Sequence, residues 1–75
     1  MIVQPKEIGA MREIKVMDLL DIDFNEATIE ELSEASGLPD YAIQRVLNDL
    51  MEAQLVTRER RIRGRNIIYT YRLAP

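Results

Sequence analysis

The chain has 75 residues, 47% of them hydrophobic, so it is long enough for one domain and too apolar for a disordered segment. It contains no cysteine and no histidine, which excludes disulfides, thiolate metal sites and the commonest general base of enzymes. The net charge of −3 hides an uneven distribution, because residues 1–56 carry −8 and residues 57–75 carry +5.

A first helix is predicted over residues 6–20, directly after Pro5, since proline favours the first turn of a helix. Its apolar side chains form two faces, one with Val16, Leu19 and Leu20 and the other with Met11, Ile14 and Met17. A surface helix needs only one apolar face. The second face is therefore either enclosed by the core or covered by a second copy of the chain through Ile8, Met11 and Ile14.

The segment over residues 21–27 is short and polar, and it is expected to form a loop with one brief strand. A run of acids around it has the composition of a calcium-binding loop: Asp18, Asp21, Asp23 and Glu26. The glycine that such a loop needs after its third ligand is missing, and Phe24 interrupts the run. We therefore interpret the acids as a solvated linker and predict no metal site.

A second helix is predicted over residues 28–36. Thr28 and Glu31 form a capping box, in which the threonine hydroxyl accepts from the Glu31 N–H and the glutamate carboxylate accepts from the Thr28 N–H. Three apolar residues at a spacing of three give this helix an inner edge: Ile29, Leu32 and Ala35. Gly37 ends the helix, because glycine adopts the left-handed backbone found at helix ends.

A third helix is predicted over residues 39–53, after a turn at Leu38 and Pro39. Its apolar residues recur at i, i+3, i+4 and i+7, which is the pattern of one buried helix face: Ile43, Val46, Leu47 and Leu50. The opposite face is polar and carries Tyr41, Gln44, Arg45, Asn48, Asp49 and Glu52.

After the third helix the apolar period changes from about 3.6 to 2, which indicates strands over residues 55–62 and 67–73. Residues 63–66 read Arg-Gly-Arg-Asn, and glycine and asparagine tolerate the positive φ of a tight turn. The two strands are therefore expected to pair as an antiparallel hairpin. The predicted core of the whole chain consists of Ile29, Leu32, Ile43, Val46, Leu47, Leu50, Leu55, Tyr69, Tyr71 and Leu73.

The segment over residues 28–50 resembles a helix-turn-helix, with a small residue in its first helix, glycine at the turn and apolar residues inside its second helix. Residues 51–59 and 64–73 resemble the helix-to-strand junction and the second wing strand of winged helix-turn-helix transcription regulators. The resemblance covers residues 12–73 and is closest to the MarR/ArsR-like group. It implies an α+β fold of three helices and a C-terminal β-hairpin, the wing. One departure is Gln54, where the family often has glycine.

The resemblance also implies that double-stranded DNA is the partner. In this fold the third helix enters the major groove, where its outward side chains meet the base edges: Tyr41, Gln44, Arg45 and Asn48. The wing brings a second set to the phosphates or the minor groove: Arg61, Arg63, Arg65 and Asn66. The alternatives are a plain solvated helix face and a charged hairpin that prevents edge-to-edge strand pairing.

The sequence favours a DNA-binding transcription regulator, expected to be a cytoplasmic homodimer that contacts DNA with its third helix and its wing. The alternative is a winged-helix module that binds another protein in a larger assembly, because one fold hosts several functions. An enzyme is not expected, since Ser33 and Ser36 have no histidine to activate them. No targeting signal, membrane-spanning stretch, cofactor or small-molecule substrate is predicted.

Overall fold

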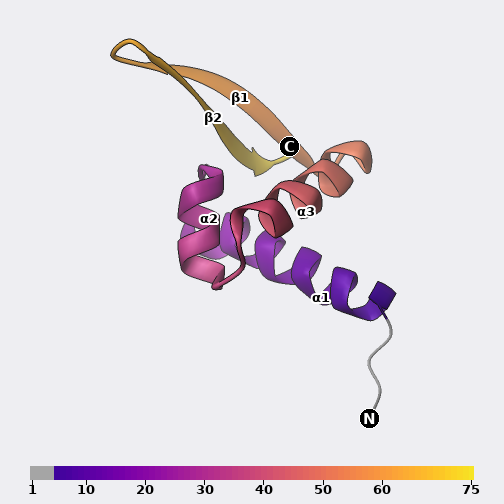
Figure 1. The fold of residues 1–75 in the computed structure, drawn as a ribbon. Coiled ribbons are helices and arrows are strands. Elements are labelled where there is room, and N and C mark those ends of the chain that lie inside the picture. The colour runs from indigo at the N-terminus through magenta and orange to yellow at the C-terminus, as the bar shows by residue number, and fades with distance from the viewer. Residues whose placement is uncertain (1–4) are drawn as a thin grey trace.

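The computed structural model describes the backbone of residues 5–75 and the side chains of residues 10–75. Three α-helices pack together, and a two-stranded antiparallel hairpin projects from them (Figure 1). In chain order the elements are α1 (Pro5–Asp18), the π-helix η1 (Leu19–Asp23), α2 (Ile29–Ser36), α3 (Asp40–Glu52), β1 (Val56–Arg63) and β2 (Asn66–Leu73). This arrangement confirms the predicted fold class, an α+β winged helix-turn-helix with a C-terminal wing.

The first helical stretch continues further along the chain than the sequence indicates. α1 passes at Asp18 directly into η1, where the Phe24 N–H donates to the Leu19 carbonyl oxygen, five residues back, at 2.8 Å. This spacing is that of a π-helical turn. Residues 21–23, which were expected to lie in a loop, are therefore helical.

The core covers only one side of α1. Val16 and Leu20 are buried, whereas Met11 and Ile14 on the second apolar face are 64% and 60% exposed. Met17, the third member of that face, packs against the core, so the core leaves only its Met11 and Ile14 part open and does not enclose the helix. The side chain of Ile8, the third member of the predicted contact between copies, lies outside the described residues.

Both ends of α2 carry the caps that the sequence predicts. The Thr28 hydroxyl accepts from the Glu31 N–H at 3.1 Å, and the Thr28 N–H donates to the Glu31 carboxylate at 3.0 Å. Gly37 follows the helix with a φ of 76° and donates to the Ser33 carbonyl oxygen at 2.9 Å. The Ser33 hydroxyl in turn donates to the Leu38 carbonyl oxygen at 2.5 Å, which fixes the turn between α2 and α3.

The inner edge of α2 differs by one residue from the prediction. Leu32 is buried and Ile29 packs against the core, but Ala35 is exposed and Ser36 is buried in its place. Leu32 and Ser36 are four residues apart and so lie on one face of the helix. The Ser36 hydroxyl accepts from the Leu38 N–H at 3.1 Å, which satisfies the buried polar group.

The core lies between the helices and the base of the hairpin. Its buried members are Val16, Leu20, Ala27, Leu32, Ile43, Val46, Leu47, Leu50, Val56 and Tyr71. The prediction was wrong for two residues, since Leu55 is 45% exposed and Tyr69 is 43% exposed. Leu55 lies in the bend between α3 and β1, where neither apolar period applies. Tyr69 lies on the part of β2 that has left the helices.

α3 ends at a left-handed residue that is not glycine. Gln54 has a φ of 63°, and its N–H donates to the Met51 carbonyl oxygen at 3.0 Å. The Leu55 N–H donates to the Leu50 carbonyl oxygen at 2.9 Å. These are the two hydrogen bonds of the Schellman motif, in which glycine usually holds the left-handed position. Gln54 thus takes the left-handed position where related regulators often have glycine. In this conformation the Cβ of Gln54 crowds the neighbouring backbone.

Replacing this residue tests the crowding. Gln54→Gly should raise the free energy of unfolding by about 1 kcal/mol, because glycine adopts the left-handed backbone without a Cβ clash. Urea denaturation followed by circular dichroism measures the change. Gln54→Ala is the matched control, since it removes the side chain but keeps the Cβ. A glycine variant no more stable than the alanine variant would show that the backbone is not crowded here.

Candidate nucleic-acid interface

The hairpin is a two-stranded ribbon whose strands pair as far as Arg63 opposite Asn66. Gly64 and Arg65 connect them, and Gly64 has a φ of 63°. A glycine with positive φ at the first connecting residue suits the type II′ turn, whose twist follows that of the paired strands. The tip of the wing therefore carries Arg63, Arg65 and Asn66, and all three are exposed.

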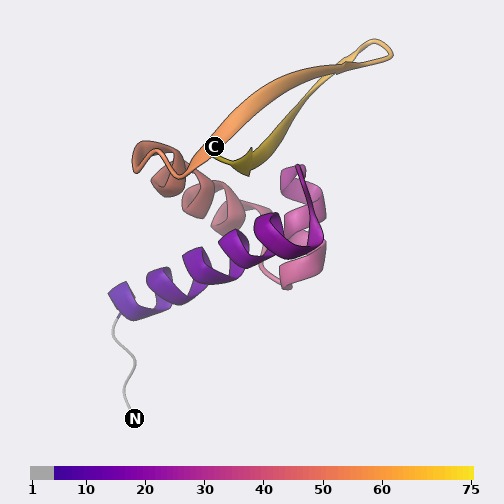
Figure 2. The same cartoon turned by 180° about the vertical axis from the view of Figure 1, so that it is seen from behind.

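The base of the hairpin is docked on the helices by a two-way backbone bridge. The Ala27 N–H donates to the Tyr71 carbonyl oxygen at 2.9 Å, and the Tyr71 N–H donates to the Ala27 carbonyl oxygen at 2.8 Å. The brief strand expected within residues 21–27 is this single bridge. Beyond it the hairpin leaves the helical body, as the views from both sides show (Figure 1, Figure 2).

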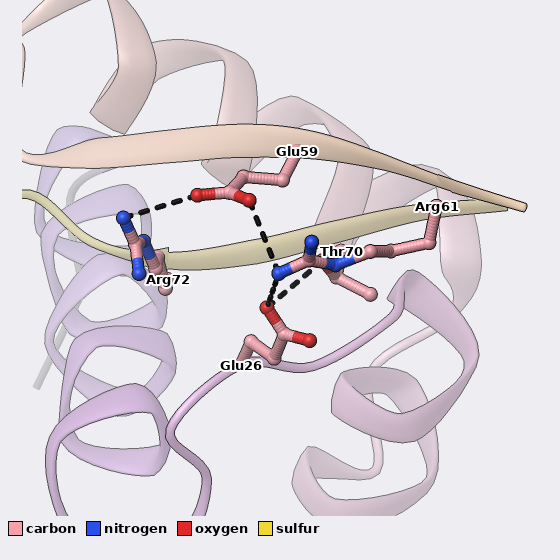
Figure 3. Close-up of polar contacts among 5 residues, drawn as sticks. All are labelled: Glu26, Glu59, Arg61, Thr70 and Arg72. Carbon is pink, nitrogen blue, oxygen red and sulfur yellow. Dashed lines mark hydrogen bonds and ion pairs between the residues drawn. The ribbon is translucent and has the colours of Figure 1, made fainter.

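A network of charged side chains holds the middle of the hairpin (Figure 3). Arg61 donates to the Glu26 carboxylate at 3.0 Å and lies 3.1 Å from the Glu59 carboxylate. The other Glu59 oxygen lies 3.0 Å from Arg72, and the Thr70 hydroxyl donates to Glu26 at 3.3 Å. The hydrogen bond from Arg61 holds the pKa of Glu26 below its ordinary value of 4.5. Glu26, which was expected in a solvated linker, therefore anchors the wing.

α3 turns a polar face to the solvent. Tyr41 is 75% exposed, and Arg45 and Asn48 are also exposed. Gln44 is half-buried, and its side-chain nitrogen donates to Asn48 Oδ1 at 3.0 Å. The two amides lie one helical turn apart, and this bond uses only one of the several donors and acceptors that they carry.

An open cleft of about 830 Å³ lies between the hairpin and the N-terminal ends of α2 and α3. The hairpin lines it with Arg63, Ile68, Tyr69 and Tyr71. The helices line it with polar and acidic side chains, among them Glu30, Glu31, Asp40, Tyr41 and Gln44. Three of the predicted contact residues therefore meet at one cleft, two from α3 and one from the wing.

The other predicted contact residues lie outside the lining of this cleft: Arg45, Asn48, Arg61, Arg65 and Asn66. The sequence analysis also missed a contact on the wing. The Arg58 guanidinium carbon lies 4.5 Å from the centre of the Tyr69 ring, a cation–π arrangement. Tyr69 lies opposite Arg60, two residue pairs along the ladder from Arg58, so Arg58 and Tyr69 are diagonal neighbours on the same face of the ribbon. The strand register, once inferred from the turn, could have revealed this contact.

Residues 12–75 match the family described as sugar-specific transcriptional regulator TrmB. The chain belongs to the TrmB family. Among solved structures, this TrmB-family domain is similar to the Zalpha domain of Carassius auratus PKZ, which was crystallised in complex with Z-DNA. The TM-score is 0.72 at 17% sequence identity, covering 88% of this chain and 97% of that chain. No curated protein sequence matches the domain.

These matches confirm the winged-helix part of the resemblance and assign the TrmB-family domain to the transcription regulators. The narrower likeness to MarR and ArsR regulators is not confirmed by them. Over residues 5–75, none of the helices is long and apolar enough to cross a membrane. Within the described part of the TrmB-family domain, no cluster of three or more acidic, histidine or cysteine side chains is placed to hold a metal ion.

The network around Glu26 predicts how stability depends on pH. Because folding lowers the pKa of Glu26 below 4.5, its ionised form stabilises the fold above that pH, and the contribution is lost as the pH falls through the folded pKa. Glu26→Gln should therefore destabilise the domain at neutral pH and approach the wild type in acid. Urea denaturation at stepped pH values measures both. In an Arg61→Met background this pH-dependent difference should shrink. A difference unchanged by that background would assign the effect to another partner.

Proposed function

We propose that this TrmB-family domain regulates transcription by binding duplex DNA, with α3 in the major groove and the wing on the backbone or in the adjacent minor groove. The observation that carries the proposal is the shared cleft, which Arg63 lines from the hairpin and Tyr41 and Gln44 line from α3. A duplex seated there would meet groups suited to base edges and a group suited to phosphate. Membership of a transcription-regulator family supports the same function.

On α3, four side chains are proposed to read the bases. Arg45 is exposed and donates two parallel hydrogen bonds to the O6 and N7 atoms of a guanine. Gln44 and Asn48, already joined by a hydrogen bond of 3.0 Å, act as one amide pair toward adenine. Tyr41 packs on a sugar or a thymine methyl with its exposed ring.

On the hairpin, Arg63, Arg65 and Asn66 are proposed to contact phosphates or the minor groove. Among the described side chains, the recorded ion pairs involve neither Arg63 nor Arg65. Arg61 differs, because its guanidinium already lies against two carboxylates. We propose that Arg61 contributes to DNA binding mainly by holding the hairpin at its spacing from α3.

Acidic residues in the cleft are proposed to direct how the duplex is seated. Glu30, Glu31 and Asp40 lie on the helix side of the cleft. Carboxylates repel phosphates, so a duplex is favoured when it presents base edges to the cleft and phosphates to the arginines at the tip.

Removing the tip charges tests the backbone role of the wing. Arg63→Ala/Arg65→Ala should lower the affinity for all duplexes alike, and the slope of log affinity against log salt should become shallower by about 1.8, the value for two phosphate contacts. Fluorescence anisotropy over a range of salt concentrations measures both. Arg63→Lys/Arg65→Lys is the charge-matched control and should keep most of the slope. A loss confined to one sequence would contradict backbone contact.

A selection from random duplexes tests the DNA-binding function itself and identifies any preferred site. Arg45→Ala should then relax the preference at one guanine position, at a cost of about 1–3 kcal/mol for that base pair. Competition binding with single-base variants of the selected site measures this cost. A wild-type protein that binds no duplex at high micromolar DNA and low salt would contradict the proposed function, and an unchanged guanine preference would contradict the role of Arg45.

We further propose that two copies of the domain pair through the open face of α1. Met11 and Ile14 are the exposed apolar side chains that support this contact. A twofold pairing would cover both faces at once and would bring two copies of α3 to one duplex.

A charge on this face should separate the copies. Ile14→Glu should give monomers, because it would place a carboxylate inside an apolar contact. Sedimentation velocity over a range of protein concentrations measures the oligomeric state, and Ile14→Val, which keeps the apolar side chain, should remain dimeric. A wild-type protein that is monomeric at every concentration would refute the pairing.

A further inference from the structure

Three apolar side chains near the tip of the hairpin are open to solvent. Ile62 on β1 and Ile67 on β2 lie directly opposite each other and are 73% and 54% exposed. Tyr69 is 43% exposed and, two residues from Ile67 on the same strand, lies on the same face of the ribbon. These residues, Ile62, Ile67 and Tyr69, form the apolar strip of the wing.

The position of the two isoleucines shows that they do not hold the hairpin on the body. Thr70 and Tyr71, nearer the base, are the buried residues of β2, and the strip begins where burial ends. A β-branched cross-strand pair does favour strand pairing, but threonine serves that purpose on a solvent-facing ribbon. Isoleucine at both positions therefore leaves apolar surface that nothing in the described residues covers.

The charges around the apolar strip indicate what covers it. Arg60 lies opposite Tyr69 on the same face as the strip, and Arg65 lies in the turn beyond the other end of the strip. Arg63 follows Ile62 and so belongs to the opposite face of the ribbon. A ligand that fits this surface needs negative charge on its rims and less polar surface between them. The minor groove of duplex DNA has this layout, with phosphates along both edges and sugars and base edges between them.

We propose that Ile62 and Ile67 press into the minor groove of duplex DNA while the neighbouring arginines bind the phosphates that flank it. This inference rests on the proposed function and adds that the contact between the wing and DNA is partly apolar. Strands of 8 residues at about 3.3 Å per residue give the hairpin a length of about 26 Å. That length exceeds half a turn of duplex, about 17 Å, so the hairpin is long enough to span from one groove to the next.

A matched pair of double variants tests the apolar contact. Ile62→Thr/Ile67→Thr and Ile62→Val/Ile67→Val give side chains of the same branched shape, which differ at each position by a hydroxyl in place of a methyl. Both are titrated by anisotropy against the duplex selected by the wild type, over a range of salt concentrations. The threonine variant should bind about tenfold more weakly than the valine variant. The two salt slopes should be equal, because an apolar contact releases no counterions.

Each other outcome is decisive. Equal affinities of the threonine and valine variants overturn the apolar contact while leaving the proposed function intact, provided that the wild type binds. A shallower salt slope for the threonine variant also overturns it, because the loss then lies in the phosphate contacts. A wild type that binds no duplex ends the proposed function and this inference together.

Thermal melts establish that both variants fold, and the single pair Ile67→Thr and Ile67→Val repeats the comparison if a double variant does not fold. A change in sedimentation of the free threonine variant assigns the strip to a contact between copies instead.

Discussion

The two backbone hydrogen bonds between Ala27 and Tyr71 determine where the wing lies. At 2.9 and 2.8 Å they join the segment before α2 to β2, and both residues are buried. Opening the bridge would leave four buried backbone groups without partners, which costs more than breaking a bond in water. The Tyr71 ring, one of the largest fully buried side chains, fills the space beneath the hairpin. Tyr71 also lines the cleft between the hairpin and the helices, so the joint forms part of that cleft.

The helix-turn-helix could be predicted from the sequence because its signals are local. The capping box spans Thr28 to Glu31, and Gly37 stands directly after the helix that it ends. The helical period alone predicts which residues of α3 face outward. It also predicts that the side chains of Gln44 and Asn48, four residues apart, are neighbours. The predicted DNA contacts of α3 remain a proposal, but the exposure of Tyr41 and Arg45 agrees with the predicted polar face.

The wing was harder to predict because its environment depends on distant parts of the chain. Glu26 and Arg61 are 35 positions apart in the sequence, and no local pattern joins them. Tyr69 and Tyr71 lie on the same face of β2, yet one is 43% and the other 2% exposed. Alternation identifies the faces of a strand, but it does not indicate how far the core extends along a ribbon that leaves the body. For the same reason, alternation does not indicate that Ile62 and Ile67 are exposed.

The ion pairs on the hairpin make the wing itself responsive to electrolytes. Arg61 and Arg72 are about half exposed while they hold their glutamates, so dissolved ions reach these pairs and screen them. Raising the ionic strength would therefore weaken the ion pairs that hold the hairpin on the helices. It would at the same time weaken any binding of a polyanion. A salt titration of DNA affinity therefore gives an upper bound on the number of phosphates that the protein contacts. Part of the measured salt dependence comes from the ion pairs of the free protein.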